Sequence, residues 1–261
     1  MDFSNITPQN NAKIFDSHAH YDDERFDGII DELLPKINSL GVERIVNCGC
    51  DNATNKKCLS LAEKFPFVYS AVGIHPCNID NGTTIEDIHN FAKHKKCVAI
   101  GEIGLDYYWE PEKKEEQKQV FKQQLELAKE LNLPVIVHDR DAHGDVLEIL
   151  KTYKPKGVVH SFSGSVEMAQ EILKLGMYLG IGGVITFNNA KKLPDVVKML
   201  PLERLLLETD APYLTPVPFR GKTNHSEMIY LTAQKIAEIK SKKMEEILNI
   251  SYQNATKLFG V

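Results

Sequence analysis

Eight short apolar segments, rich in β-branched and aromatic residues, recur along this chain and alternate with segments of helical periodicity. Apolar residues within each short segment are nearly continuous, a pattern typical of strands buried on both faces of a parallel sheet. The alternation, with short connections, favours an α/β fold with a single (β/α)8 (TIM) barrel over an open doubly wound sheet. The predicted strands are KIFDSH (13–18), RIVNCG (44–49), FVYSAVGIH (67–75), CVAIGEIG (97–104), PVIVHD (134–139), GVVHSF (157–162), YLGIGG (178–183) and RLLLETD (204–210).

The intervening segments space their apolar residues as amphipathic helices do. In 28–40 the apolar stripe consists of Ile29, Leu33, Ile37 and Leu40, and we expect Pro35 to kink this helix or to lie near its start. Further helices are expected at 115–132, 143–153, 166–176 and 193–201, and from Ser226 to the end of the chain.

Length and composition predict one domain. The chain has 261 residues, 43% of them hydrophobic, which is enough for one barrel-sized core. We therefore expect a single domain over 1–261, with a polar lead-in at 1–12. The start lacks the apolar core of a signal peptide, and no apolar run approaches the ~20 residues of a membrane span. We expect no membrane contact, no obligate protein partner, and a location in the cytoplasm or the nucleus.

Charge and cysteine content narrow the function classes. The net charge of −5 argues against a protein that holds DNA through a broad basic surface, so any contact with nucleic acid must be local. The five cysteines contain no Cys-x-x-Cys pair, which predicts reduced thiols that serve mainly as small buried hydrophobic residues.

Metal-binding residue types stand at or just after the ends of most predicted strands. In a barrel these strand ends meet at one rim, where active sites are built. Imidazole and carboxylate groups together bind zinc, manganese or cobalt, whereas magnesium depends more on oxygen. A carboxylate can bridge two ions that hold both the attacking water and the leaving oxygen. The residues concerned are Asp16, His18, His20, His75, Glu102, His138, His160, Glu208 and Asp210.

The remaining histidines fall in predicted helices or loops, where a histidine most often has no metal. We expect all four to be surface residues: His89, His94, His143 and His225.

Seven ordered motifs between residues 15 and 224 carry a family resemblance. They are FDSHAHYDD, GIHP, GEIGLDYY, VIVHDRDA, HSFSGS, LLLETDAPYL and PVPFRGKTN. Together they resemble the TatD family of metal-dependent deoxyribonucleases, in the amidohydrolase-like barrel superfamily. The resemblance implies a TIM barrel with two divalent metal ions or more (Mg, Mn or Zn) and hydrolysis of phosphodiester bonds in DNA.

The resemblance also implies roles for individual residues. His18, His20 and Asp210 match the ligands of one metal, His138 and His160 match those of a second, and Glu102 matches the bridging carboxylate. Asp210 would also act as the general base. His75 and Glu208 match accessory positions, and His75 is expected to help hold the phosphoryl group. Related barrels often use a carbamylated lysine as the bridge, so a glutamate favours the TatD branch.

Two positions depart from the family pattern. Cys77 stands where a histidine commonly follows GIHP, and Ser226 stands where a proline commonly follows RGKxN. Neither departure removes a predicted ligand.

Local cations and aromatic residues are candidates for substrate binding. Arg220 and Lys222 flank a glycine in the PVPFRGK loop, and Arg140 follows His138; all three are expected to contact phosphate. The aromatic cluster at 107–109, Tyr107-Tyr108-Trp109, is expected either to stack on bases or to pack as a lid over the rim.

We therefore expect a metal-dependent hydrolase; the resemblance implies DNA as its substrate and 3′–5′ exodeoxyribonuclease activity, with a preference for single-stranded ends and no reading of base sequence. One alternative is an ester or amide hydrolase of small molecules or of aminoacyl-tRNA that uses the same metals, because the fold alone does not select the substrate. A second alternative is a catalytically silent barrel that serves as a scaffold.

Overall fold

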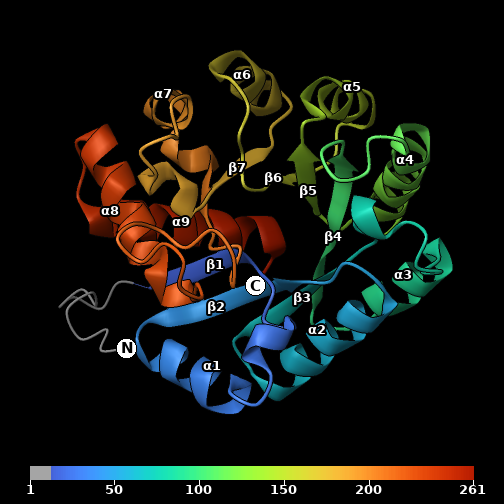
Figure 1. Cartoon of the computed structure of the whole chain (residues 1–261), viewed down its shortest axis with the longest axis horizontal. Helices are drawn as coiled ribbons and strands as arrows, with labels where there is room; N and C mark the ends of the chain where they lie inside the picture. The colour runs from blue at the N-terminus through green and yellow to red at the C-terminus, as the bar shows by residue number, and fades with distance from the viewer. Residues whose placement is uncertain (1–12) are drawn as a thin grey trace.

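The computed structural model describes residues 13–261, so the predicted lead-in at 1–12 lies outside the described residues. Eight parallel strands follow one another around a ring in sequence order, which confirms the predicted barrel (Figure 1). The strands are β1 (Ile14–Ala19), β2 (Val42–Cys48), β3 (Val68–Val72), β4 (Cys97–Asp106), β5 (Val135–Arg140), β6 (Gly157–Val159), β7 (Tyr178–Ile181) and β8 (Leu205–Leu207).

The ring closes where β8 meets β1. The two strands are joined by a single parallel bridge between Ala19 and Ala211, which lies just beyond β8. The Asp210 N–H donates to the carbonyl of His18 at 2.9 Å, and the Ser17 hydroxyl donates to the carbonyl of Leu207 at 3.0 Å. This seam completes the barrel and brings the two ends of the strand order together.

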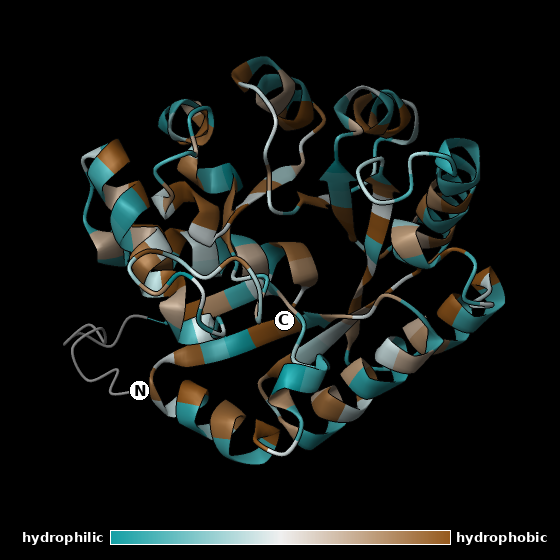
Figure 2. Ribbon diagram, in the orientation of Figure 1, coloured by the Kyte–Doolittle hydropathy of each residue, from teal (hydrophilic) through white to brown (hydrophobic). Residues whose placement is uncertain are grey.

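Helices surround the strands and bury their apolar stripes against them. Figure 2 shows hydrophobic and hydrophilic residues alternating along the helical ribbons, as amphipathic helices require. The helices are α1 (Ile30–Ser39), α2 (Asn52–Lys64), α3 (Ile85–Ala92), α4 (Lys114–Glu130), α5 (His143–Tyr153), α6 (Val166–Lys174), α7 (Leu193–Met199), α8 (Ile229–Lys240) and α9 (Met244–Phe259).

The first helix differs from its predicted form. Ile29 precedes α1 as its N-cap and is 48% exposed, so it does not join the buried stripe, which consists of Leu34 and Ile37. Pro35 lies inside the helix and on its exposed side. At that position the carbonyl left without a helical partner can bond to water, which makes an internal proline tolerable.

The interior of the barrel is a separate core from the layer between strands and helices. Phe15, Ile136 and Tyr178 project into it from three strands, and Ala255 and Phe259 of α9 close it from one end. Since α9 blocks this end, a site can open only at the other, where the carboxyl ends of the strands lie.

Among the described residues, none of the helices combines the length and the hydropathy needed to cross a bilayer.

Candidate metal centre

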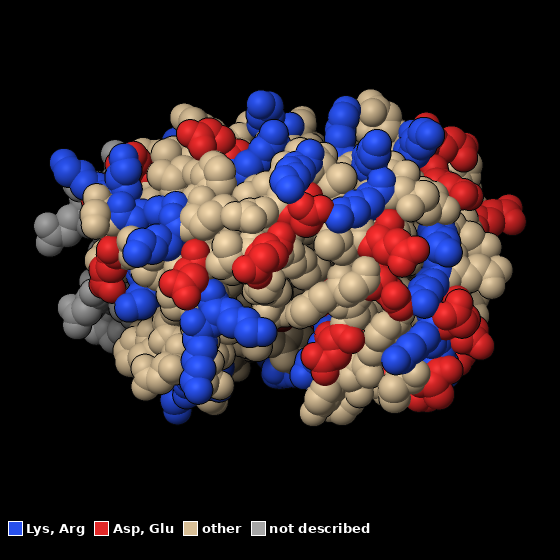
Figure 3. Space-filling model, turned by 90° about the horizontal axis from the view of Figure 1, so that it is seen from above, with Lys and Arg blue, Asp and Glu red and all other residues tan. Residues whose placement is uncertain are grey.

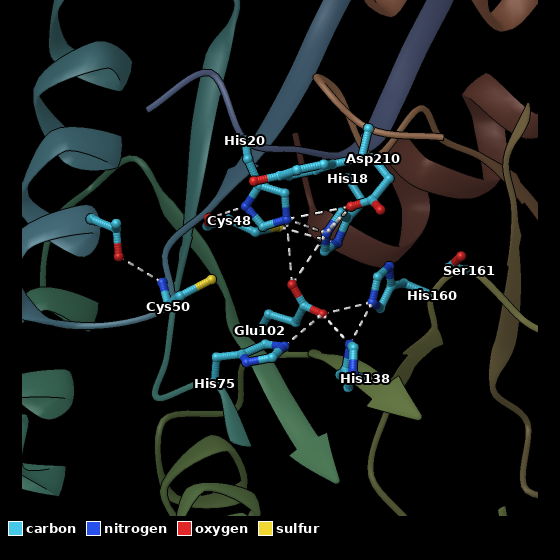
Figure 4. A network of polar contacts seen from close by, with 12 residues as sticks. His18, His20, Cys48, Cys50, His75, Glu102, His138, His160, Ser161 and Asp210 are labelled. Carbon is cyan, nitrogen blue, oxygen red and sulfur yellow. Dashed lines mark hydrogen bonds and ion pairs between the residues drawn. The ribbon is translucent and has the colours of Figure 1, made fainter. Parts of the chain in front are cut away.

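Residues far apart in the sequence meet at the carboxyl ends of the strands. Their side chains point toward Glu102, which lies between two groups of histidines (Figure 4). Most of these residues line a cavity of about 940 Å³ that opens at this rim and that we call the metal cavity. The six predicted metal ligands are therefore brought together: His18, His20, Glu102, His138, His160 and Asp210.

The first cluster consists of His18, His20, Glu102 and Asp210. The Nε2 atoms of the two histidines lie 3.0 Å apart. Each of these nitrogens also lies 3.4 Å from Oε2 of Glu102 and 3.4 Å from Oδ1 of Asp210. Four ligands in a regular tetrahedron around zinc, with bonds of about 2.1 Å, lie about 3.4 Å from one another. The spacing of the first cluster therefore fits a tetrahedrally bound divalent ion.

The second cluster uses the other oxygen of the same glutamate. Oε1 of Glu102 lies 2.6 Å from Nδ1 of His138 and 2.7 Å from Nε2 of His160. The two histidine nitrogens are 3.4 Å apart. The two short distances are those of direct carboxylate–imidazole hydrogen bonds, and the three atoms lie close enough together to be candidate ligands of a second ion. Glu102 thus has the placement of a bridging ligand.

Outer hydrogen bonds select which nitrogen each histidine presents. Nδ1 of His20 lies 2.9 Å from the carbonyl of Cys48, and Nε2 of His138 lies 3.0 Å from Oδ2 of Asp106. Because a carbonyl and a carboxylate accept, each of these nitrogens carries a proton, and the opposite nitrogen is the one that can bind an ion after losing its own proton. Nδ1 of His18 lies 3.4 Å from the Cys48 sulfur. Such outer partners orient ligands in protein metal sites.

The two carboxylates of the first cluster are held ionised. Burial disfavours their charge, but the histidines outweigh it: His160 and His18 hold the pKa of Glu102 well below its usual range, and hydrogen bonds from His18 and His20 lower the pKa of Asp210. Asp210 has a φ of 58°, a left-handed conformation that aspartate tolerates better than most residues. Anionic oxygens set among imidazoles are the donor set of a catalytic divalent metal.

His75 is placed as a hydrogen-bond donor, and its ring also groups with Glu102 and His138 as a possible metal ligand. Its Nδ1 accepts the N–H of Cys77 at 3.1 Å, so the proton of the neutral ring lies on Nε2. Burial and the neighbouring charge of His138 lower the pKa of His75 to about 3, which keeps the ring neutral. Nε2 lies 3.6 Å from Oε1 of Glu102 and faces the cavity.

Glu208 lies behind His160, on the side away from Glu102. Its Oε1 accepts the N–H of Ser161 and lies 3.9 Å from Nδ1 of His160, and burial raises the pKa of Glu208 to about 8. Among residues 13–261, Nδ1 of His160 has no hydrogen-bond partner, so a small shift of the Glu208 carboxyl group would let Glu208 orient this ring. The Glu208 carboxyl group fits here because residue 180 is glycine, since a Cβ at this position would collide with Oε2 of Glu208.

The predicted phosphate-binding cations lie in two adjoining cavities. Arg140 lines the metal cavity, whereas Arg220 and Lys222 line a neighbouring cavity of about 390 Å³. The two cavities share Tyr213 and Leu214 as a common wall. Arg220 and Lys222 therefore lie outside the cavity of the metal-binding residues, in a cavity that adjoins it.

The aromatic cluster at 107–109 divides into two parts. Tyr107 packs against the core and donates its hydroxyl to Asp145 at 2.6 Å. Tyr108 and Trp109 are 53% and 62% exposed, and the Arg140 guanidinium lies 4.3 Å from the Tyr108 ring centroid and 5.6 Å from that of Trp109. Tyr213, 41% exposed, also lines the metal cavity.

The two departures from the family pattern have different consequences. Cys77 uses its backbone N–H to hold His75, a contact that does not depend on its side chain. Ser226 donates its hydroxyl to Asp16 at 2.6 Å and lies 2.7 Å from the Tyr21 hydroxyl, so a buried network replaces proline there. Asp16 also accepts from the N–H and the hydroxyl of Thr209, which joins β1 to the segment after β8.

Sequence reasoning overlooked some residues and misplaced another. Cys48 and Asp106 contact ligand histidines and orient them. Their position at the ends of β2 and β4 is the sequence feature that could have identified them. His225 is less exposed than predicted: its side chain is 15% exposed, and its Nδ1 lies 3.3 Å from Oε1 of Glu227. His143, 42% exposed, lies 2.8 Å from Asp139.

Comparison with known proteins agrees with this geometry. Residues 15–260 match the model of the family described as TatD related DNase. The chain is 45% identical to the uncharacterized metal-dependent hydrolase YabD of Bacillus subtilis, covering 95% of this chain and 99% of that protein. It is 36% identical to the uncharacterized metal-dependent hydrolase YcfH of Escherichia coli, covering 95% and 96%.

A solved structure shows the same fold. The TatD homologue YjjV of Escherichia coli superposes with a TM-score of 0.91 at 33% identity, over 97% of this chain and all of that one. A ring of eight strands, two metal-ligand clusters that share one glutamate, and sequence similarity over almost the full length agree with one another. The chain belongs to the TatD family of metal-dependent hydrolases.

Proposed function

We propose that this protein hydrolyses phosphodiester bonds in DNA and removes nucleotides from the 3′ side of single-stranded ends. The observation that carries the proposal is Glu102, whose two oxygens face two separate groups of histidines at the floor of one cavity. Paired metal sites of this kind suit in-line displacement at phosphorus. The family description, TatD related DNase, supports DNA as the substrate class.

The residues of the chain account for each step. Two divalent ions held in the clusters would lower the pKa of a water molecule and polarise the phosphoryl oxygen. Asp210, ionised and facing the first cluster, accepts a proton from the attacking water, whose oxygen forms the new bond to phosphorus. His75 donates its Nε2–H to a non-bridging oxygen. The bond to the sugar oxygen breaks, and that oxygen takes up a proton relayed from solvent.

The size and lining of the cavity support a single strand as the substrate. A volume of about 940 Å³ suits a strand end of one or two nucleotides, whereas a duplex is too wide for a pocket of this class. Trp109 and Tyr213 offer exposed ring faces at the same cavity, and bases of any sequence can stack on such faces.

The charged residues support recognition of the backbone. Arg140 lies beside the exposed rings, and Arg220 and Lys222 line the adjoining cavity, where the next phosphates of a strand would pass. Phosphate contacts position a nucleic acid without reading its bases. Figure 3 shows acidic and basic side chains interspersed over the face that it displays, a distribution that fits local rather than broad contact with DNA.

The test is a substrate panel with protein that has been stripped by a chelator and then reloaded with magnesium, manganese or zinc separately. The panel contains single strands labelled at either end, duplex DNA, simple esters and lactones, and an aminoacyl ester. We expect mononucleotides to be released from the 3′ end, and we expect activity to be lost in the stripped protein and in Glu102→Ala.

Two outcomes would overturn the proposal. Turnover of an ester, a lactone or the aminoacyl ester, without cleavage of DNA under any metal, would favour the alternative hydrolase. Undiminished DNA cleavage by the stripped protein would instead contradict the metal mechanism.

A further inference from the structure

Cys50 places a thiol beside the first metal cluster. It lies two residues after β2 ends at Cys48, and its sulfur points toward His20 and Glu102 (Figure 4). One ligand atom from each of these three residues lies within 4.8 Å of the other two. Cys50 also lines the metal cavity, so its sulfur shares the space in which ions and substrate would be bound.

The backbone on both sides of Cys50 holds this sulfur in place. Its N–H donates to the Thr54 hydroxyl at 2.8 Å, and its carbonyl accepts the N–H of His75 at 2.9 Å. The next residue, Asp51, is the N-cap of α2 and accepts the N–H of Thr54 at 2.9 Å. Because three elements fix this short turn, the direction of the Cys50 side chain follows from the fold rather than from a flexible loop.

A thiolate at this position discriminates between metals. Thiolates bind soft and borderline ions such as zinc, whereas magnesium takes oxygen ligands. His18, His20, Glu102 and Asp210 alone suffice for tetrahedral coordination, and nitrogen and oxygen donors of this kind also accept manganese. The Cys50 sulfur, grouped with His20 and Glu102, would add a ligand that only the thiophilic metals can use.

We propose that Cys50 is a ligand for thiophilic ions at the first cluster, where it joins His20 and Glu102 and makes the site prefer zinc over magnesium. On binding, the thiol releases its proton to solvent and the sulfur forms a bond to the ion. Neither the family pattern nor the names of the relatives gives this residue a role. The choice of metal at this cluster does not depend on which substrate is cleaved, so it can be measured separately from DNA hydrolysis.

Cobalt spectroscopy tests the sulfur bond without any substrate. Stripped protein is loaded with Co²⁺, and the near-ultraviolet absorption from thiolate-to-cobalt charge transfer is recorded for the wild type, Cys50→Ser and Cys77→Ser. Cys77 is the matched control, because it lines the same cavity but belongs to none of the ligand groups. We expect the band in the wild type and in Cys77→Ser and its loss in Cys50→Ser at equal cobalt content. A band of equal strength in Cys50→Ser, or none in the wild type, overturns the proposal.

The affinities of the wild type and Cys50→Ser for zinc and for magnesium measure how much the sulfur contributes to each metal. We expect Cys50→Ser to bind zinc about 10- to 100-fold more weakly, a loss of the size seen when groups that support a metal site are removed. Magnesium affinity should stay within about threefold, because magnesium does not use the sulfur. Equal losses for both ions would point to general damage to the site and would contradict a specific sulfur bond.

Alkylation of the unmodified protein provides a test that needs no variant to fold. The rates at which iodoacetamide modifies Cys50 and Cys77 are measured by peptide mass spectrometry, with saturating zinc or saturating magnesium. We expect zinc, and not magnesium, to slow alkylation of Cys50 by at least about tenfold relative to Cys77, because a metal-bound thiolate is no longer free to react. Equal protection of both cysteines, or no protection of Cys50 by zinc, refutes the assignment.

Discussion

Glu102 has two oxygens that face different histidines, and the removal of this one side chain should affect both clusters. We predict that Glu102→Ala loses both metals, whereas His138→Ala loses one, since His138 contacts only the second cluster. The rate should fall on the order of 10²-fold or more in Glu102→Ala. Metal content per chain and turnover, measured on both variants, provide the check, and two equally mild variants that retain both ions would contradict a bridging role.

The charge of His138 makes metal binding depend on pH. Burial disfavours its protonated form, but hydrogen bonds with Asp106 and Glu102 outweigh burial and raise the pKa of His138 to about 9. At pH 7 a chelator-stripped protein therefore keeps a proton on this ring, and a metal must displace it. Apparent affinity for the second ion should rise by about tenfold per pH unit and level off above pH 9.

Titration calorimetry in buffers of different ionisation enthalpy would count the released protons. Asp106→Asn is the informative variant, because removal of the carboxylate should lower the pKa of His138 and move the rise in affinity to lower pH. Affinity for the second ion that does not change between pH 6 and pH 9 would show that no such proton is displaced.

At the level of elements, α9 is the part of the barrel that lies opposite the site. Phe259 is 6% exposed, and its ring centroid lies 5.8 Å from that of Phe15 inside the barrel. We predict that Phe259→Ala lowers the free energy of unfolding by about 3–5 kcal/mol, as expected for a large buried ring. Metal stoichiometry should not change, because the ligands lie at the other end of the strands.

Denaturant unfolding measures this effect, with Lys257→Ala as the control on the exposed side of the same helix. That substitution should change the free energy of unfolding by less than about 0.5 kcal/mol. If Phe259→Ala were as mild as the control, α9 would not be closing the interior core.

The elements also show what the sequence could predict. Eight nearly continuous apolar segments that alternate with helices favour the barrel, although an open doubly wound sheet also covers both faces of its strands, and the structure decides for the ring. Strand ends were harder: β6 stops at Val159 and β8 at Leu207, so His160, Glu208 and Asp210 lie in the turns beyond them. Ser161 and Asp210 have φ values of 43° and 58°, and a pattern of apolar residues does not report such local turns.

The division of the C-terminal region was not predicted either. The sequence indicates helix from Ser226 onward, whereas the structure has α8 and α9 separated at Ser241, which has a left-handed φ of 52°. Both helices are amphipathic, so periodicity does not reveal that one packs on the outside of the barrel and the other closes its interior. That difference depends on tertiary packing.

For the whole molecule, an acidic chain with few placed cations should bind DNA with a shallow dependence on salt. Two or three phosphate contacts predict a slope of about −2 in log affinity against log salt for a single strand. Trp109 is the one tryptophan of the chain and lines the metal cavity, so quenching of its fluorescence in chelator-stripped protein should report binding without cleavage.

Arg220→Ala should weaken this binding equally for all base sequences and make the slope shallower by about 0.7, because one phosphate contact with a single strand is lost. Lys174→Ala, on α6 and outside both cavities, is the matched control and should leave the slope unchanged. A steep slope in the wild type would reveal a basic contact surface other than these residues.

An ion bound at the first cluster would link the two strands that meet at the seam between β8 and β1. The Thr209 hydroxyl donates a hydrogen bond to Asp16 across this seam, although the two residues lie 193 positions apart. In the first cluster, His18 and His20 come from β1 and its end, and Asp210 comes from the segment after β8. An ion held there joins the beginning of the barrel to its end in the folded state only, so its binding stabilises the folded state relative to the unfolded chain. Loss of the ion would therefore remove a stabilising link between β1 and the segment after β8 as well as the catalytic metal. Amide hydrogen exchange in β1 should then accelerate before exchange in the other strands.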